Sequence, residues 1–550
     1  MGMDRHPAEK HFWWQTEVIY QIYPLSFADS NGDGHGDLPG ILGKLDYLQW
    51  LGVNAIWISP IYPSPLADYG YDVSDYRAIH PLFGTMEDFD RLLAACHERG
   101  LKVLLDYVPN HTSDQHPWFV ESRSARNSPQ RDWYIWREAS RDGRVPNNWL
   151  SVFGGSAWQW DENTRQYYCH SFLKEQPDLN WRNPEVQEAM LDVMRFWLDK
   201  GVDGFRVDAL WHVMKDAQFR DNPLDPDYVE GQMSPYCRLI PAYSGGQPEL
   251  HEVVGLMRRV TQEYPERVLI GEMYLPVEEL VRYYGQDGDS GIHLPYNFQL
   301  ILLPWRAMEV FAGINTYEAS LPALAWPNWV LGNHDKPRVA SRVGPEQAKI
   351  AALLLLTLRG TPTMYYGDEI GMEDVNVPAE ETRDPVAKAF PGIRLGRDPE
   401  RTPMQWSAEP NAGFSTGQPW LPIAEDYEET NVEKQKQNEG SLLAFYRRLL
   451  ELRQKEPALQ IGRYLPAGQK RNLFAFVREH DETTLLIAVN LGATRARMEV
   501  PRHMDVVGEV ILGTDPARVG GKIKDYIELG PDEGLIARTL PADVAPQRRA

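Results

Sequence analysis

Polar and ionisable side chains lie in or just after several short apolar runs of this sequence. The candidate groups are Asp106, Asn110, His111, Arg206, Asp208, Glu272, Asn333, His334 and Asp335. If these runs are parallel strands of one barrel, their carboxyl ends share one mouth. Four carboxylates, two imidazoles and an arginine would then meet at a single site, where acid–base and nucleophilic chemistry are possible.

Asp208 and Glu272 are the candidates for a catalytic pair. Side chains alternate across a strand, so Arg206 and Asp208 share a face, and the arginine is expected to keep Asp208 ionised as a nucleophile. Glu272, facing two other carboxylates in a partly dry pocket, is expected to have a raised pKa and to act as a general acid. Two such groups about 5 to 5.5 Å apart cleave glycosidic bonds with retention. The alternative is that these residues are helix caps and salt bridges at loop entries.

Eight apolar runs are the expected strands that position these groups. They cover residues 18–24, 55–60, 102–111, 203–209, 267–274, 293–299, 328–335 and 361–369. Most are separated by stretches with apolar residues at spacings of three and four, such as 38–52, 85–100 and 185–201. This alternation predicts an α/β fold, a (β/α)8 TIM barrel.

Three segments depart from that alternation. Residues 111–180 are too long for an ordinary loop and are predicted to form a small inserted domain B after the third strand. Residues 210–246 are rich in Pro, Asp and Gly and are expected to form a lid over the barrel mouth. Residues 461–550 alternate as strands do, which predicts a C-terminal all-β sandwich, domain C. The barrel would comprise residues 1–110 and 181–460.

Composition excludes several function classes. With 56 Lys and Arg against 78 Asp and Glu, the net charge is −22, which argues against nucleic acid and anionic membranes as partners. Three cysteines without a CxxC spacing support neither a disulfide framework nor a zinc site, and a reducing cytoplasm is expected. The longest apolar run, residues 350–358, is too short to span a bilayer, so no membrane anchor is predicted.

Four motifs in this order and spacing resemble the signature regions of the α-amylase family, glycoside hydrolase family 13. They are DYVPNH (106–111), GFRVDAL (204–210), GEMY (271–274) and GNHDKPR (332–338). Three further segments, SFADSNGDGHGD, QPDLN and RDPERTPMQW, are similar to the oligo-1,6-glucosidase and α-glucosidase branch of that family. The resemblance runs from about Trp13 to the C-terminal domain.

The resemblance implies a role for individual residues. Asp208 would be the nucleophile, Glu272 the acid/base and Asp335 the transition-state stabiliser. Asp68 and Arg401 would grip the terminal glucose, with Arg397 as the alternative partner of Asp68. The other implied substrate-binding residues are Tyr71 as a stacking platform, Phe153, Phe172 and Gln176 as subsite residues, Ala209 beside the leaving sugar, and His111, Arg206 and His334 around the sugar.

The segment DSNGDGHGD (29–37) carries oxygen ligands at alternate positions, as calcium loops do. The candidate ligands are Asp29, Asn31, Asp33, the carbonyl of His35, and Asp37. The resemblance implies one structural Ca²⁺, with Mg²⁺ possible, away from the catalytic centre. The alternative is a Gly-Asp turn without an ion. The glycine spacing does not fit a dinucleotide site, and no organic cofactor is expected.

The leading prediction is therefore a retaining, exo-acting α-glucosidase that removes terminal glucose from maltose and short oligosaccharides, favouring α-1,4 bonds. The runner-up uses the same site for transfer or isomerisation, as transglucosidases, trehalose synthases and sucrose isomerases do. A catalytically inactive relative with a binding role is disfavoured, because all three carboxylates are present. The expected partner is a small saccharide, and the chain would be a monomer or a homo-oligomer.

Overall fold

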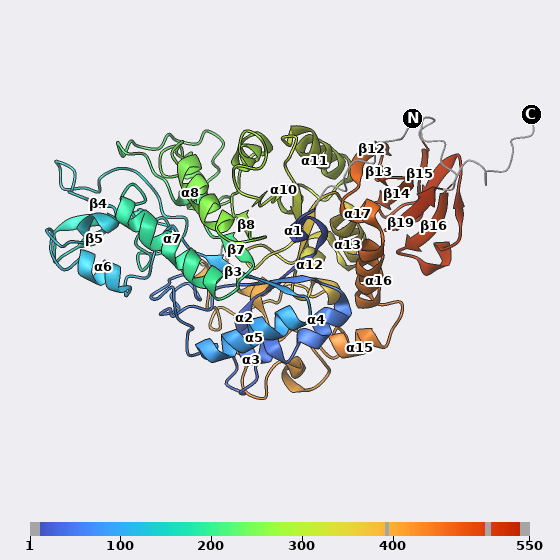
Figure 1. Cartoon of the computed structure of the whole chain (residues 1–550), viewed down its shortest axis with the longest axis horizontal. Coiled ribbons are helices and arrows are strands. Elements are labelled where there is room, and N and C mark those ends of the chain that lie inside the picture. The colour runs from blue at the N-terminus through green and yellow to red at the C-terminus, as the bar shows by residue number, and fades with distance from the viewer. Residues whose placement is uncertain (1–10, 391–394, 501–507, 540–550) are drawn as a thin grey trace, which may run out of the picture.

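Eight parallel strands form the centre of the molecule (Figure 1). The computed structural model describes residues 11–390, 395–500 and 508–539. The strands are neighbours in the order β10-β11-β1-β2-β3-β7-β8-β9. Their bounds are β1 Ile19–Ile22, β2 Ala55–Ile58, β3 Lys102–Tyr107, β7 Gly204–Val207, β8 Val268–Gly271, β9 Leu294–Pro295, β10 Asn328–Val330 and β11 Thr361–Tyr365. Each lies within one of the eight predicted runs, which confirms the (β/α)8 barrel.

The barrel is nearly closed, and side chains bridge the gap between β9 and β10. Strand β9 has only two residues, and one of them, Pro295, has no N–H to donate to a neighbouring strand. The side chain of Asn328 spans the gap instead. Its Oδ1 accepts the N–H of Asn297 at 2.9 Å, and its Nδ2 donates to the carbonyl of Pro295. The sixth strand, β9, is therefore short because Pro295 cannot donate a backbone hydrogen bond and the side chain of Asn328 replaces strand pairing.

Helices follow the strands around the outside of the barrel (Figure 1). Helix α5 begins with a capping box, in which Thr85 and Asp88 each accept the other's backbone N–H. The stretch predicted as one helix over 38–52 is two, because the chain turns at residues 43 and 44. The main helices are α3 Leu38–Leu42, α4 Leu45–Leu51, α5 Met86–Glu98, α7 Pro184–Asp199, α8 Leu250–Gln262, α11 Ala307–Ser320, α13 Ala348–Thr357 and α16 Leu442–Lys455.

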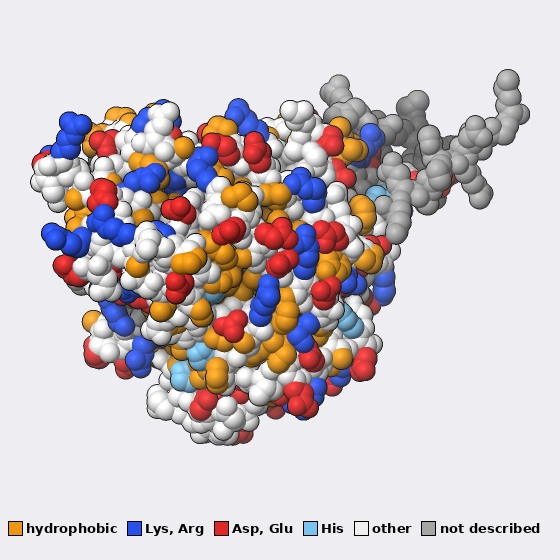
Figure 2. All heavy atoms as spheres, turned by 60° about the vertical axis from the view of Figure 1, so that its left-hand side comes forward, with side chains coloured by type: hydrophobic (Ala, Val, Ile, Leu, Met, Phe, Trp, Pro, Cys, Tyr) orange, Lys and Arg blue, Asp and Glu red, His pale blue; other side chains and the backbone are white. Residues whose placement is uncertain are grey.

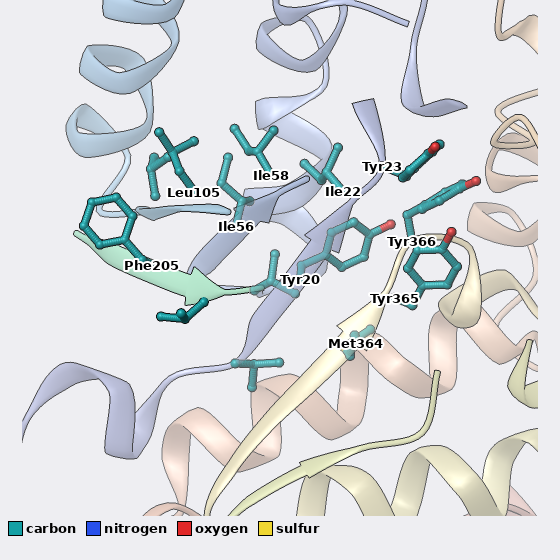
Figure 3. Packing of buried hydrophobic residues seen from close by; sticks show 14 of the residues in the cluster. Tyr20, Ile22, Tyr23, Ile56, Ile58, Leu105, Phe205, Met364, Tyr365 and Tyr366 are labelled. Carbon is teal, nitrogen blue, oxygen red and sulfur yellow. The ribbon is translucent and has the colours of Figure 1, made fainter. Parts of the chain in front are cut away.

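Alternate side chains of the strands enter two apolar layers. Ile22 and Ile58 belong to the large cluster that also contains residues of α4 and α5 (Figure 3). Trp57 and Leu104 belong to a separate cluster inside the barrel. Two residues along β3 from Leu104, the next inward position is Asp106, which is fully buried. The interior therefore changes from apolar to charged toward the carboxyl ends of the strands.

The segment after β3 forms a small antiparallel sheet, in the order β4-β6-β5. Its strands are β4 Trp136–Arg137, β5 Trp158–Asp161 and β6 Gln166–Cys169. The expected lid segment packs against this inserted domain. The ring of Phe219 stacks on Trp149 at 5.5 Å, and the indole of Trp149 donates to the carbonyl of Arg220 at 2.8 Å. The two long insertions thus support each other.

The C-terminal part contains a six-stranded antiparallel sheet, β12-β13-β14-β19-β16-β17, and a two-stranded sheet, β15-β18. The hairpin predicted over 472–491 is β13 with β14, whereas β12, β17 and β18 were not predicted. Residues 540–550 of this predicted domain lie outside the described residues. The strand bounds are β12 Arg463–Lys470, β13 Leu473–His480, β14 Thr483–Asn490, β15 Ala496–Glu499, β16 Gly508–Gly513, β17 Lys522–Ile523, β18 Tyr526–Leu529 and β19 Gly534–Thr539.

The surface agrees with the composition. On the face shown in Figure 2, Lys and Arg side chains are interspersed with Asp and Glu side chains, without a large basic patch. Nowhere in the described ranges is there a helix that is long and apolar enough to cross a bilayer.

Candidate active site

Arg206 is the centre of the charged cluster at the barrel mouth. Its guanidinium lies 2.7 Å from Asp106, 2.6 Å from Asp208 and 2.9 Å from Glu272. The strand register explains the arrangement, because β3 and β7 place Asp106 beside Arg206, and Asp208 follows two residues later on the same face. Glu272 comes directly after β8, the next strand. One buried cation thus holds three carboxylates from three neighbouring strands.

Glu272 is oriented by the backbone next to Asp208. Its Oε2 accepts the N–H of Ala209 at 2.9 Å. Ala209 has φ of +45°, a left-handed conformation that non-glycine residues rarely adopt. This turn directs the Ala209 N–H toward Glu272, so the residue after the proposed nucleophile fixes the proposed acid.

The pKa of Asp208 differs from the expectation. Burial raises this pKa well above its usual range, Arg206 lowers it, and Glu272 and Asp106 raise it further. One arginine therefore does not compensate three buried carboxylates. The expectation that Arg206 keeps the pKa of Asp208 low is wrong, because desolvation outweighs the ion pair.

Asp335 is the carboxylate whose pKa is lowered. Although burial opposes ionisation, His334, Arg397 and Arg401 together hold the pKa of Asp335 well below its usual range. Arg401 donates to Asp335 Oδ1 at 2.9 Å, and Arg397 donates to the same oxygen at 3.2 Å. A carboxylate that stays ionised thus shares the mouth with Asp208, whose pKa is raised.

An ion pair closes the site on the side of Asp68. Arg397 donates to Asp68 Oδ1 at 2.8 Å, and the Gln176 amide donates to Asp68 Oδ2 at 3.1 Å. The predicted partner, Arg401, instead binds Asp335 and the carbonyl of His334 at 2.7 Å. The pairing of Asp68 with Arg401 is therefore a wrong prediction. Arg397, the alternative, lies closer because Asp384 holds it.

Aromatic rings and imidazoles form the remaining wall. Tyr71 stacks on His334, with ring centroids 5.3 Å apart and planes 1° from parallel, and its hydroxyl lies 2.7 Å from Nε2 of that histidine. Phe172 contacts both Phe153 and His111, at centroid distances of 5.5 and 5.3 Å. All the predicted subsite residues thus lie around the same mouth.

Comparisons with known proteins agree with this geometry. Residues 21–462 match the family model for the alpha amylase catalytic domain. The chain belongs to the α-amylase family. It is 42% identical to a probable alpha-glucosidase of Rhizobium meliloti, over 89% of this chain and 91% of that one. It is 40% identical to an oligo-1,6-glucosidase of Heyndrickxia coagulans, over 89% and 94% of the two chains.

A solved structure extends the comparison to the whole fold. A crystal structure described as an alpha-glucosyl transfer enzyme is 41% identical, covers 96% of this chain and 100% of its own, and superimposes with a TM-score of 0.91. The family model and the α-glucosidase and oligo-1,6-glucosidase relatives show that this chain is a glycoside hydrolase.

The predicted metal loop is ordered by its own backbone. Both oxygens of Asp29 accept backbone N–H groups, from Asn31 and Gly32 on one side and from Gly34 on the other. Asp37 caps α3 by accepting the N–H of Gly40. Within the described residues, no three His, Cys, Asp or Glu side chains are gathered so that they could hold a metal ion. The metal site at this loop stays a prediction.

Two residues that contribute to this site were not predicted. Gln21 approaches Nδ1 of His334 at 2.7 Å from inside β1, where its inward position follows from strand alternation. Asp384 accepts two N–H groups of the Arg397 guanidinium and its backbone N–H. It is the N-cap of the short helix α14 (Pro385–Ala389), 13 residues before Arg397, so no periodicity in the sequence indicates the contact.

Proposed function

We propose that the protein is a retaining, exo-acting α-glucosidase that favours α-1,4 bonds in maltose and short oligosaccharides. The observation that carries the proposal is the placement of Asp208 and Glu272 on one guanidinium, at a mouth closed by Asp68 and Arg397. The relatives named a probable alpha-glucosidase and an oligo-1,6-glucosidase support α-glucosidase activity.

In the proposed mechanism, a carboxylate oxygen of Asp208 attacks the anomeric carbon, and Glu272 gives its proton to the departing glycosidic oxygen. Asp335, ionised by its cationic neighbours, stabilises the positive charge that develops on the sugar. Glu272 then removes a proton from water, which attacks the glucosyl ester and regenerates the Asp208 carboxylate. Two inversions at the anomeric carbon give net retention.

Exo action follows from the Asp68–Arg397 pair. The side chains of Arg397 and Asp68 are only 12% and 5% exposed, so a substrate that cannot offer hydroxyl groups to them leaves polar atoms desolvated without a sugar partner. The glucose at the non-reducing end has free hydroxyl groups to offer to this pair. An internal glucose carries the next sugar on one of those oxygens. Substrates with a blocked non-reducing end should therefore resist cleavage, and rapid internal cutting of starch would contradict the proposal.

The stereochemistry provides the decisive test. Proton NMR during the first minutes of hydrolysis of an aryl α-glucoside, whose leaving group is not a sugar, should show α-glucose before mutarotation adds the β-anomer. If β-glucose forms first, Asp208 is not a nucleophile. If the purified protein releases no glucose from maltose, isomaltose, sucrose or trehalose, the function itself is refuted.

Transfer is the second candidate function, and the similarity to an alpha-glucosyl transfer enzyme favours it. The same glucosyl ester would be captured by a sugar hydroxyl rather than by water. Product analysis at increasing maltose concentration separates the two. Glucose as the main product at all concentrations supports hydrolysis, and trisaccharide as the main product supports transfer.

We also propose that the loop at residues 29–37 binds one structural Ca²⁺. The alternation of oxygen-bearing residues supports it, in a loop that turns tightly at Gly32 and Gly34, which both have positive φ. If the ion binds only the folded state, a chelator should lower the melting temperature without changing turnover at low temperature. Elemental analysis without bound metal, together with unchanged melting, would favour the ion-free turn. The cytoplasmic location and the oligomeric state stay predictions.

A further inference from the structure

A buried ion pair joins the inserted domain to the barrel behind the proposed sugar site. Nζ of Lys215, in the segment after β7, lies 2.9 Å from Oδ2 of Asp178, and their side chains are 3% and 0% exposed. Desolvation offsets much of the attraction in so buried a pair, so stability alone is a weak reason for its position.

The same ammonium group orients an amide. Nζ of Lys215 donates to Oδ1 of Asn110 at 2.7 Å. With its oxygen held there, the Asn110 Nδ2 donates to Oδ1 of Asp178 at 2.9 Å and faces Nδ1 of His111 at 3.1 Å. A flipped amide would place its NH2 group against the ammonium, where no acceptor is available, so Lys215 selects one of the two amide orientations.

The amide orientation determines the position of a proton on His111. A neutral imidazole that accepts a hydrogen bond at Nδ1 carries its proton on Nε2. Burial lowers the pKa of His111 to about 4, so the ring is neutral at pH 7. In that tautomer Nε2 donates its proton to the carbonyl of Tyr71 at 3.2 Å, and the amide nitrogen of Gln176 lies 3.1 Å from the same ring atom.

We propose that Lys215 is a positioning residue that, through Asn110, keeps His111 in the Nε2–H tautomer and so holds the imidazole, hydrogen-bonded to the carbonyl of Tyr71, in place at the sugar site. The inference rests on the proposed glucose site and adds a residue that touches no substrate. It also gives the inserted domain a role in sugar recognition, because Asp178 completes the network.

The test is a double-mutant cycle read by calorimetric binding of D-glucose, which does not depend on turnover. Lys215→Met and His111→Ala should each weaken glucose binding by about two- to tenfold, the contribution of one hydrogen bond. The double variant should bind no more weakly than His111→Ala alone, because Lys215 acts only through the position of the His111 ring. If Lys215→Met does not fold, Lys215→Met/Asp178→Asn removes both buried charges and should weaken binding equally.

The matched control is Arg123→Met. It breaks the Arg123–Asp161 ion pair, 2.8 Å long, within the same inserted domain. This variant should melt earlier but bind glucose as the wild type does. Additive losses in the cycle, unchanged binding by the Lys215 variants, or an equal loss in the control would overturn the role of Lys215. A wild type without glucose affinity would overturn the proposed function as well.

Discussion

The two ends of strand β7 carry buried charge in opposite ways. At its amino end, Asp203 is one carboxylate with two cationic partners, Lys102 at 3.3 Å and Arg267 at 3.4 Å, and a hydrogen bond to His97 at 2.7 Å. At its carboxyl end, Arg206 is one cation among three carboxylates. Despite burial, the partners of Asp203 lower its pKa, whereas the pKa of Asp208 is raised.

The charged groups at the two ends of β7 therefore differ in what they contribute. Those at the amino end contribute to fold stability, and those at the carboxyl end to the chemistry. The amino end has more than enough positive charge, so its carboxylate stabilises the fold when ionised. The carboxyl end has an excess of negative charge, which costs stability but poises carboxylates for reaction. Functional groups of TIM barrels lie at the carboxyl ends of strands, and the charge balance of β7 gives this rule a physical content.

The largest expected effect is on activity at the carboxyl end. Asp208→Asn removes the proposed nucleophile, and Glu272→Gln removes the proton donor, whose contribution alone is typically about 10² to 10⁴-fold. We expect kcat on maltose to fall at least that far in both variants while circular dichroism stays that of the wild type. Normal turnover by purified Asp208→Asn would refute the assignment.

The next effect is on stability at the amino end. Asp203→Asn leaves Lys102 and Arg267 without their carboxylate and should reduce the free energy of unfolding by about 1 to 3 kcal/mol, the cost of unpairing one partner. Calorimetry checks the loss. The kcat of the folded variant should equal that of the wild type, and a loss of kcat would mean that the two ends of β7 are not separate in function.

The pH dependence of stability should differ in sign between the two ends. The folded pKa of Asp203 is below the ordinary 3.8, so its stabilisation is present at neutral pH and is lost as the pH falls through the folded pKa. The folded pKa of Asp208 is raised, so ionisation costs stability as the pH rises through it.

Melting temperatures at pH 7.5 and pH 4 measure this difference. At pH 7.5, Asp208→Asn should melt above the wild type and Asp203→Asn below it. The advantage of Asp208→Asn should shrink at pH 4, because less of the cost of ionising Asp208 is present as the pH approaches the ordinary value of 3.8. Equal shifts of both variants in one direction would remove the contrast between the two ends.

The smallest effect concerns linkage choice at the carboxyl end. Ala209→Val should shift the ratio of kcat/KM for maltose and isomaltose toward isomaltose, and added methyl groups in such a pocket are worth about 1 to 3 kcal/mol. Because φ of Ala209 is +45°, a β-branched side chain should also strain the turn and lower the melting temperature. Ala209→Gly is the control, since it relaxes the backbone without adding bulk. An unchanged ratio in Ala209→Val would exclude a role of side-chain size.

Much of the fold was predictable because it depends on local periodicity. The eight strands and their order along the chain follow from short apolar runs, and the shared face of Arg206 and Asp208 follows from alternation along one strand. Alternation does not predict contacts that side chains make in place of strand pairing. At β9, the gap to β10 is bridged by the side chain of Asn328. The unpredicted C-terminal strands are irregular or short: β12 contains Pro466 and Gly468 at a β-bulge in its pairing with β13, and β17 has only two residues. Only β18 pairs with a strand that does not adjoin it in the sequence, β15.

The sequence by itself determined which groups could react, since residue type and strand position place Asp208, Glu272 and Asp335 at one mouth. Only the tertiary structure decided which charged partners surround the site and in which direction each pKa is shifted. The choice of Arg397 over Arg401 as the partner of Asp68 depends on a contact between residues 329 positions apart. The raised pKa of Asp208 depends on how much water the packed barrel excludes. Desolvation and long-range pairing are properties of the assembled interior, whereas periodicity needs only neighbours along the chain.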